Sequence, residues 1–371
     1  MGGLKVNEML TYKSINKVTN KIKSTCENKK SLNKFYLNYN QNIYNILIKL
    51  FKDKYSFSRY KIFIIREPKY RIIMSEILED KIVNHLISNY ILIPNIENRL
   101  IYSNVATRKN KGSKLAYDLV IKYLNKLIYL NTDIYALKID ISKYFYNIDH
   151  EILFSEVSKV IKDEKALRYI KNIIDSTNDE YINKSILDVI KKEKDKVNKS
   201  CLSVKEKYDR IVELDKIPLY SYGKGLPIGN LSSQILAIFY LNKVDHFIKE
   251  NIGCKYYVRY MDDLIIFDND LERLKCNFKL INSEINKLKL IVNKKSRIYN
   301  LKYCVTFLGY NFKVSNNKIV IRYKSDSIKR IKNRLINLKK YDYDMYLKSK
   351  TSYKGYLSFG NTKLKDDMLE I

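Results

Sequence analysis

Three aspartates lie where the sequence predicts that β-strands end. Residues 134–141 alternate as a half-buried strand does, and Asp140 is close to the end of that segment. Residues 256–267 form two apolar runs separated by Asp262 and Asp263, which predicts a β-hairpin with both acids at its turn. Carboxylates from separate strands can converge on Mg²⁺, which prefers oxygen ligands. Such a trio could hold two cations about 3.5–4 Å apart, the arrangement that nucleotidyl transfer requires.

An Asp-Asp pair alone is weak evidence, because it is also common in ordinary turns. The same pair recurs at Asp366 and Asp367 with nothing to suggest chemistry. If Asp140 and the other two acids do converge, they repel one another, and we expect at least one raised carboxyl pKa.

The elements that must position these acids alternate between helical and strand patterns in the first half of the chain. Helical spacing covers most of residues 1–60, and the stretch near Pro68 is rich in basic residues. The expected elements are two β-rich runs over 61–74 hinged on Glu67-Pro68, a helix over 76–90 that stops before Pro94, a basic loop over 103–112 and a helix over 115–130.

The second half is expected to hold a helical insertion and a basic C-terminal part. A glycine-rich loop at 223–230 precedes an expected helix over 232–249, with Ser232 or Ser233 as its cap. The other expected elements are a helical region over 155–216 with a charged hairpin near 190–208, a helix over 271–288, a strand over 290–298, a helix over 325–338 and a tyrosine-rich loop around Tyr353 and Tyr356.

Charge indicates a polyanionic partner. The 371 residues include 70 Lys and Arg against 40 Asp and Glu, a formal net charge of +30. An A/T-rich genome would also produce abundant Lys, Asn, Ile and Tyr. Codon bias does not explain the excess of bases over acids, however, because Asp and Glu have A/T-rich codons too. The balance therefore favours nucleic acid as a partner.

The remaining composition favours a cytoplasmic protein without zinc. The five cysteines are scattered with no C-x-x-C pair, so we expect reduced thiols. The N-terminus has no apolar signal core, Val6 occupies the place where a myristoylation motif needs Ser or Thr, and no apolar run approaches the ~18 residues of a membrane span.

Five motifs in order resemble those of reverse transcriptases. The hairpin YMDD at 260–263 matches the YxDD box, and LKIDISKYFYNIDH at 137–150 is similar to the first-aspartate motif. GLPIGNLSSQ at 225–234 resembles the nucleotide-contacting loop and helix of that family. FLGY at 307–310 resembles the primer grip, and the basic stretches at 66–71 and 103–112 resemble the fingers motifs.

The resemblance implies an α+β right-hand polymerase with fingers, an antiparallel palm sheet and a short thumb. The implied domains are an N-terminal helical extension over 1–60, fingers over 61–135, a palm over 136–154 and 217–312, a helical insertion over 155–216 and a helical thumb over 313–371. The short piece after Tyr310 leaves no expectation of an RNase H, endonuclease or integrase.

The resemblance also implies roles for individual residues. Asp140 and Asp262 would bridge two Mg²⁺, for which Mn²⁺ could substitute, with Asp263 a weaker ligand and the Ile141 carbonyl assisting. Lys295 would protonate the pyrophosphate leaving group, although a solvated lysine is an equal alternative.

Nucleotide and nucleic-acid contacts follow from the same match. Phe145, five residues after Asp140, would block a ribose 2′-hydroxyl, with core packing as the alternative. Lys69 and Arg71 would grip the triphosphate, with Arg66 nearby. The other expected contacts are Ile228, Gly229 and Gln234 to the nucleotide, and Arg66, Arg108, Lys109, Lys111, Tyr260, Met261, Leu308 and Gly309 to nucleic acid.

One departure from the family pattern indicates a particular group of reverse transcriptases. Ile228 stands where many reverse transcriptases carry Gln, and the form LPIGNLSSQ resembles enzymes of diversity-generating retroelements and bacterial defence systems. The implied partners are a structured non-coding template RNA, its cDNA and dNTPs, with an accessory protein or a second copy left open. An RNA-dependent RNA polymerase is disfavoured by Phe145, and an idle RNA-binding scaffold is disfavoured by the intact acid triad.

Overall fold

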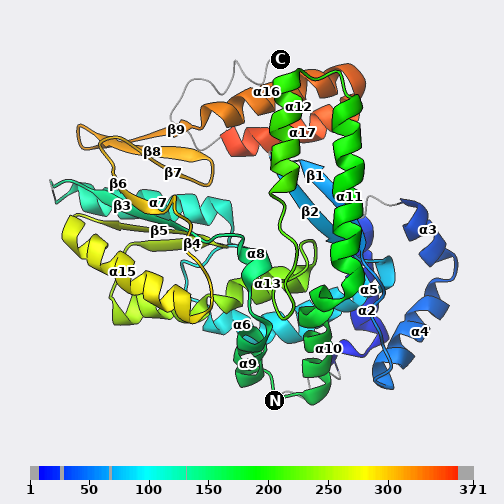
Figure 1. The fold of residues 1–371 in the computed structure, drawn as a ribbon. Coiled ribbons are helices and arrows are strands. Elements are labelled where there is room, and N and C mark those ends of the chain that lie inside the picture. The colour runs from blue at the N-terminus through cyan, green and yellow to red at the C-terminus, as the bar shows by residue number, and fades with distance from the viewer. Residues whose placement is uncertain (1–7, 26–28, 67–68, 131, 358–371) are drawn as a thin grey trace. The chain divides into compact units, whose positions relative to one another are not determined.

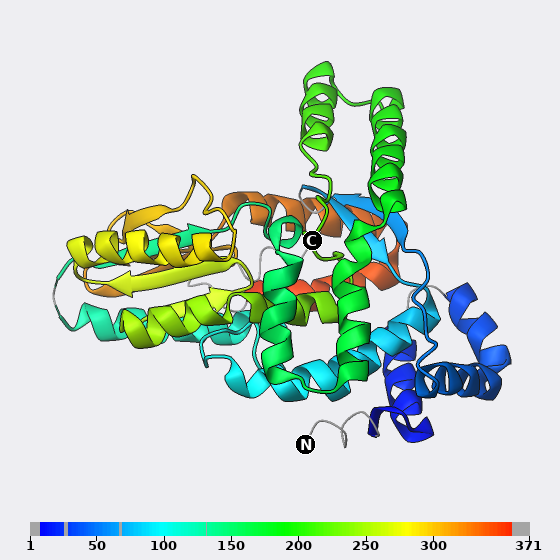
Figure 2. The same cartoon turned by 60° about the horizontal axis from the view of Figure 1, so that its bottom comes forward.

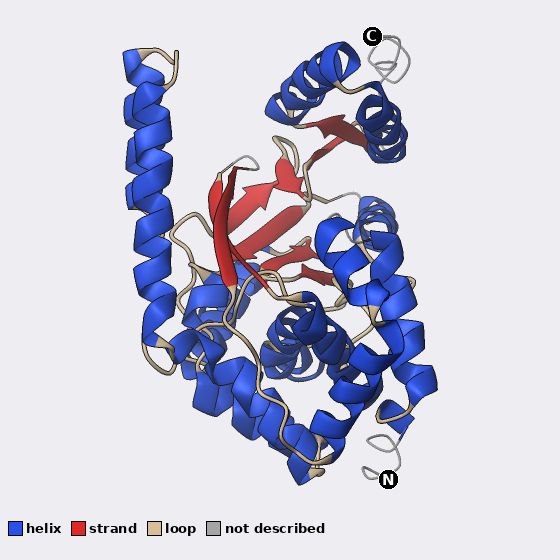
Figure 3. Cartoon of the chain, turned by 90° about the vertical axis from the view of Figure 1, so that its right-hand side faces the viewer, coloured by secondary structure: helices blue, strands red, loops and turns tan. Residues whose placement is uncertain are grey.

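A computed structural model describes residues 8–25, 29–66, 69–130 and 132–357 (Figure 1). The chain divides into two compact units, each made of three segments. Unit 1 comprises Met1–Ile101, Ser142–Asp245 and Glu284–Ile291, and unit 2 comprises Tyr102–Ile141, His246–Ser283 and Val292–Ile371. Strands are fewer than helices in the described residues and form three separate antiparallel sheets (Figure 3).

Unit 1 is mainly helical and contains one two-stranded sheet. Its strands pair with Ile65 opposite Arg71. The elements are α2 (Tyr12–Thr25), α3 (Lys29–Leu37), α4 (Tyr39–Phe51), β1 (Lys61–Arg66), β2 (Tyr70–Ser75), α5 (Leu78–Ile87), α6 (Ile93–Ile96), α8 (Tyr144–Asn147), α9 (His150–Val160), α10 (Glu164–Asp175), α11 (Glu180–Lys199), α12 (Val204–Asp215), α13 (Leu231–Tyr240) and α14 (Asn242–His246), whose last residue belongs to unit 2.

Helices α11 and α12 form the expected charged hairpin and extend side by side from the rest of unit 1 (Figure 2). Ser203 begins α12 with a capping box, because its hydroxyl accepts from the Glu206 N–H while Glu206 bonds back to the Ser203 N–H. Apolar residues of α11, including Ile182 and Ile186, pack with Ile72 and Met74 of β2 in one core. The hairpin is thus fixed to the sheet at its base.

Unit 2 contains a four-stranded sheet in the order β4-β5-β3-β6. Its apolar core joins this sheet to α7 and to a three-stranded sheet, through residues such as Val120, Phe267 and Phe312. The elements are α7 (Ser113–Ile128), β3 (Tyr135–Asp140), β4 (Tyr257–Tyr260), β5 (Asp263–Asp268), β6 (Arg297–Asn300), β7 (Val305–Phe307), β8 (Tyr310–Ser315), β9 (Lys318–Tyr323), α16 (Ser325–Tyr341), α17 (Tyr343–Leu357) and α15 (Leu271–Lys287), whose last turn belongs to unit 1.

Two helix boundaries differ from expectation. The helix that begins with α5 does not stop before Pro94, because a π-helical turn at Ser88–Leu92 continues it into α6. Pro94 lies at the second position of α6, directly after the π-helical turn. Helix α13 begins at Leu231, after Asn230. The expected cap at Ser232 or Ser233 is therefore wrong.

Two further expectations, both for the C-terminal half of the chain, are wrong. The strand expected over 290–298 is confined to β6, and residues 293–296 form a turn. The expected loop around Tyr353 and Tyr356 is the end of α17. Tyr356 packs against Tyr310, so a tertiary aromatic contact accompanies the helical form. The Glu67-Pro68 hinge lies outside the described residues. No helix in the described part of the chain is long and apolar enough to cross a membrane.

Candidate active site

The acid-bearing hairpin of unit 2 brings two of the three aspartates into register. Asp140 ends β3 directly opposite Asp263 of β5, and Asp263 is also opposite Tyr260 of β4. Met261 and Asp262 form the two-residue turn, and Met261 has a positive φ of 55°. The sheet therefore gathers all three acids at one end.

Burial and crowding act together on Asp263. Burial, with a smaller contribution from the neighbouring Asp262 and Asp140 carboxylates and against the opposing effect of Lys138, raises the pKa of the Asp263 carboxyl to about 6. The expectation of a raised carboxyl pKa is confirmed. The Lys138 ammonium lies 3.4 Å from Asp263 Oδ2 and donates to the Thr306 carbonyl at 2.9 Å.

Asp140 is held from the other side by the turn at 293–296. The Asn293 amide donates to Asp140 Oδ2 at 2.9 Å, and the Asn293 N–H donates to the Asp140 carbonyl at 2.8 Å. The Asp140 N–H donates to Ser296 Oγ at 3.0 Å. Lys295 is an exposed residue of this turn, so the fold keeps it beside the backbone that fixes Asp140.

A fully buried arginine supports the hairpin turn. Arg259 has no exposed surface, and its Nη1 donates to the Met261 carbonyl at 2.8 Å. Its backbone pairs with the basic loop, because the Arg259 N–H donates to Ser103 O and the Val105 N–H donates to Arg259 O. The guanidinium thus fixes the turn that carries Met261 and Asp262.

Sequence reasoning missed Lys138, Arg259 and Asn293 as supports of the acids. Lys138 lies two residues before Asp140, so a strand period of two places both on one face, a signal that could have identified it. Arg259 stood out as a base inside an apolar strand. Asn293 gave no local signal.

The donor set fits a hard divalent cation. Asp263 Oδ1 is buried without a hydrogen-bond partner, and carboxylate oxygens are the ligands that Mg²⁺ prefers. As the side chains stand, no group of three or more His, Cys, Asp or Glu residues among those described is arranged to hold a metal ion. Asp263 Oδ2 and Asp140 Oδ2 face Lys138 and Asn293 instead.

Other expected nucleic-acid contacts of unit 2 lie on turns. Arg108 Nη1 donates to the Asn104 carbonyl at 2.8 Å, Lys109 is exposed, and Lys111 Nζ donates to the Tyr102 carbonyl at 2.9 Å.

The expected primer grip is the turn between β7 and β8. Leu308 and Gly309 both have positive φ, 49° and 87°, the backbone of a tight hairpin turn. A side chain at Gly309 would meet the Tyr356 hydroxyl, which donates to the Gly309 carbonyl at 3.1 Å. The end of α17 thereby fixes the turn.

In unit 1 the residues expected to bind the triphosphate lie at one end of the β1–β2 hairpin. Arg66 is opposite Tyr70, and Lys69 and Arg71 flank that pair; all three bases are exposed. Glu213 of α12 lies 3.8 Å from Arg66 Nε and accepts from the Tyr70 N–H at 3.1 Å. The three charges therefore stand close together.

The glycine-rich loop of unit 1 is fixed to β2 and to the segment around α8. The Met74 N–H donates to the Ile228 carbonyl at 2.8 Å, and a side chain at Gly229 would meet Met74 O at 2.6 Å. The Leu226 N–H donates to the Phe145 carbonyl at 2.8 Å. Phe145 itself is half-buried, so it is not simply a core residue.

The N-terminal end of helix α13, which carries Gln234, is hydrogen-bonded to a buried side chain of α5. Asn84 of α5 accepts from the Ser232 N–H at 3.1 Å and donates to Glu76 at 2.8 Å. Burial, together with the nearby Asp80 carboxylate, raises the pKa of Glu76 to about 8. Gln234 is half-buried in the first turn of this helix.

Comparisons with known proteins give a family and several structural likenesses. Residues 65–312 match the family model described as "Reverse transcriptase (RNA-dependent DNA polymerase)". No curated protein matches the chain.

Three similar solved structures are telomerases. Telomerase of Candida tropicalis truncated from its C-terminal domain is 15% identical with a TM-score of 0.48, covering 72% of this chain and 55% of that one. Telomerase of Candida albicans with a fragment of telomeric RNA is 14% identical with a TM-score of 0.44, covering 76% and 50%. Apo telomerase of Candida tropicalis is 14% identical with a TM-score of 0.45, covering 74% and 49%. This chain therefore spans about half the length of these structures.

Proposed function

The chain belongs to the reverse transcriptase family, and from that premise we propose that it copies a structured RNA into DNA from dNTPs by two-metal nucleotidyl transfer. Membership makes it an α+β enzyme of the RNA-directed DNA polymerase class, and this family generally uses divalent metal ions. The observation that supports the mechanism is the opposition of Asp140 and Asp263 beside the Asp262 turn.

The aspartates supply the oxygen ligands in this proposal. Asp140 and Asp262 would hold the Mg²⁺ ions, with Asp263 and the Ile141 carbonyl as further ligands. Bound cations would activate the primer 3′-hydroxyl and neutralise the triphosphate. Lys138 keeps Asp263 Oδ2 beside a positive charge while Oδ1 remains unpartnered.

Other residues would bind and select the nucleotide. We assign the triphosphate to Lys69 and Arg71 with Arg66 nearby, because three exposed bases at one hairpin end suit a polyanion. Lys295 would donate a proton to the pyrophosphate. The Phe145 ring would exclude a 2′-hydroxyl, and Gly229 and Gln234 would line the nucleotide with Ile228.

The loops of unit 2 would hold the nucleic acid. Arg108, Lys109 and Lys111 offer charge to backbone phosphates. Tyr260 and Met261 would contact the primer end, and Leu308 with Gly309 would form the primer grip.

The proposed setting is a diversity-generating retroelement or an anti-phage defence system. It rests on the resemblance of LPIGNLSSQ to enzymes of both kinds. Sequencing of the nucleic acid that copurifies with the protein would test it: a copied repeat beside a variable gene supports the first, and a self-contained structured RNA supports the second. Ribosomal and transfer RNA alone would contradict both.

Template-directed extension tests the function itself. The protein should extend a DNA primer on an RNA template with dNTPs and Mg²⁺, and rNTPs should be excluded. Extension with rNTPs in preference to dNTPs would instead indicate an RNA polymerase.

A further inference from the structure

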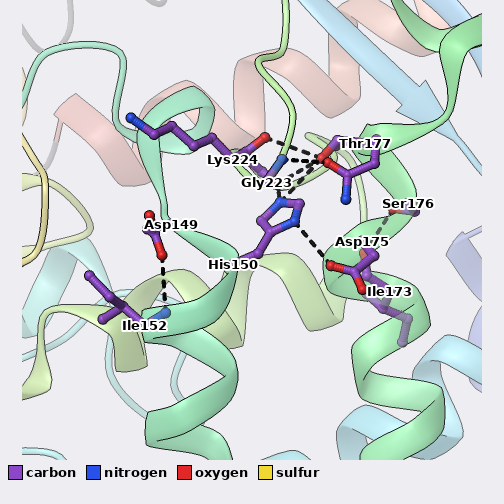
Figure 4. A network of polar contacts seen from close by, with 11 residues as sticks. Asp149, His150, Ile152, Ile173, Asp175, Ser176, Thr177, Gly223 and Lys224 are labelled. Carbon is purple, nitrogen blue, oxygen red and sulfur yellow. Dashed lines mark hydrogen bonds and ion pairs between the residues drawn. The ribbon is translucent and has the colours of Figure 1, made fainter.

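A buried histidine in unit 1, the last residue of the first-aspartate motif, links this motif to the glycine-rich loop. His150 opens α9 and is 4% exposed. Its Nδ1 lies 3.1 Å from Asp175 Oδ1 of α10 (Figure 4). Its Nε2 lies 2.7 Å from the Gly225 carbonyl. None of the roles assigned above uses this side chain.

The hydrogen-bonding chemistry of the two partners determines which ring nitrogens of His150 carry hydrogen. A carbonyl oxygen only accepts, so Nε2 must carry hydrogen and donate to Gly225. A carboxylate also only accepts, so the contact with Asp175 is favourable when Nδ1 carries hydrogen as well. His150 therefore fits this position best as an imidazolium that donates in both directions.

The charged neighbours are consistent with that form. Asp149 precedes the ring but is already paired with Lys289, whose ammonium lies 2.7 Å from Asp149 Oδ2. Figure 4 shows the Lys224 amino group pointing away from the ring. Among the described residues, Asp175 is thus the carboxylate that pairs with the imidazole.

Gly225 is fixed at each of its polar atoms. Its carbonyl accepts from the Thr177 hydroxyl at 2.9 Å as well as from His150, and its N–H donates to the Ile148 carbonyl at 2.8 Å. The His150 N–H donates to Gly223 at 3.0 Å. A side chain at Gly225 would meet the Tyr220 ring at 2.5 Å, so the loop has no room to shift toward it.

The anchored stretch leads directly to the proposed nucleotide contacts. Leu226 follows Gly225 and bonds to the Phe145 carbonyl, while Ile228 bonds to β2. The spacing between Phe145 and Ile228 therefore depends on how firmly Gly225 is held. We propose that His150, joined to Asp175, is a positioning residue that sets this spacing for dNTP selection; the inference rests on the proposed polymerase function.

His150→Gln tests the proposal through a split between KM and kcat. The variant cannot bridge Asp175 and Gly225 with a charged ring, so KM for dNTP should rise about tenfold and rNTP misincorporation should rise, while kcat at saturating dNTP changes by less than about threefold. His246→Gln is the matched control, because His246 is a more exposed histidine that forms a helical pair with Glu250. It should leave both constants unchanged.

Asp175→Asn tests whether Asp175 and His150 act as one unit. An Asn side chain can still bond to Nδ1 but carries no charge, so KM for dNTP should rise by less than in His150→Gln, and the double variant should show no further rise beyond His150→Gln. Additive rises in KM in the double variant would overturn the proposal. So would an unchanged KM in folded His150→Gln when the wild type is active.

Amide hydrogen exchange separates this inference from the polymerase function. The Gly225 and Leu226 amides should exchange faster in His150→Gln than in the wild type, whatever the activity. Unaltered exchange would refute the anchoring role. Failure of the wild type to extend any primer would refute the proposed function while leaving the exchange result to decide the anchor.

Discussion

The acid-bearing hairpin of unit 2 and the stretch from Gly223 to Leu226 in unit 1 differ in how far their buried polar atoms are hydrogen-bonded. Asp263 Oδ1 is buried with no hydrogen-bond partner, and neighbouring carboxylates add repulsion. The Gly225 carbonyl, by contrast, accepts from both His150 and Thr177. An unpaired buried polar group costs about 1–3 kcal/mol, so the hairpin retains a cost that a bound cation would remove. The loop carries no such cost at Gly225, which suits a part that must keep its shape.

The largest expected effect is at the hairpin. Asp262→Asn should lower dNTP incorporation by about a thousandfold or more, about 4 kcal/mol in the barrier, because it removes a charged cation ligand. RNA binding should change little, because the variant removes no phosphate contact. Primer extension and filter binding on one preparation measure both. Near-normal extension by Asp262→Asn would refute the assignment of this site.

The next largest effect is expected on discrimination against rNTPs, at Phe145 beside the glycine-rich loop. Phe145→Ala should lower discrimination against rNTPs by roughly 10–100-fold, about 1.4–2.7 kcal/mol, because the ring that would clash with the 2′-hydroxyl is gone. Paired kcat/KM values for one dNTP and its rNTP measure this. Unchanged rNTP exclusion would reduce Phe145 to a packing residue. Tyr144→Phe is a matched control, since it keeps the neighbouring ring and removes only the hydroxyl that donates to Ala237.

Excess positive charge gives an effect of similar size on RNA binding. Affinity for structured RNA should fall roughly tenfold or more between about 50 mM and about 200 mM salt, because Lys and Arg contacts displace condensed counterions. A flat dependence would mean that the surplus of 30 charges reflects codon usage alone.

The Ile228 position predicts a smaller effect, on fidelity. Gln can donate and accept hydrogen bonds where Ile only packs, so Ile228→Gln should lower misincorporation on a defined RNA by up to roughly tenfold, or 1.4 kcal/mol. Deep sequencing of products from both proteins measures it. Equal error frequencies would assign Ile228 to packing alone.

The smallest expected effect is on stability, at the start of α13. The raised pKa of Glu76, about 8, means that the folded state holds this proton more tightly than the unfolded chain, whose pKa is about 4.5. The associated stability is fully present below about pH 4.5 and is lost as pH rises through about 8. Glu76→Gln should therefore raise Tm by roughly 2–4 °C at alkaline pH and leave it unchanged at about pH 4.5. An identical shift at both pH values would contradict this account.

The sequence predicted the hairpin because its signals are local. The two apolar runs on either side of the acids predict a hairpin, although only Asp262 lies in its two-residue turn and Asp263 begins β5; the pairing of β5 with β3 places Asp140 opposite Asp263. The supports were not predictable in the same way. Asn293 reaches Asp140 across 153 residues, and His150 reaches Gly225 across 75. Such contacts depend on tertiary packing, as does the π-helical turn that carries the chain past Pro94.

Primer extension by the wild-type protein tests the central claim most directly. With an RNA template, a DNA primer, dNTPs and Mg²⁺, it should give DNA complementary to the template, and EDTA should abolish the product. Product that persists in EDTA would contradict cation-dependent catalysis at the aspartates. The absence of product from folded protein with Mg²⁺ or Mn²⁺, on RNA that it binds, would contradict the polymerase function.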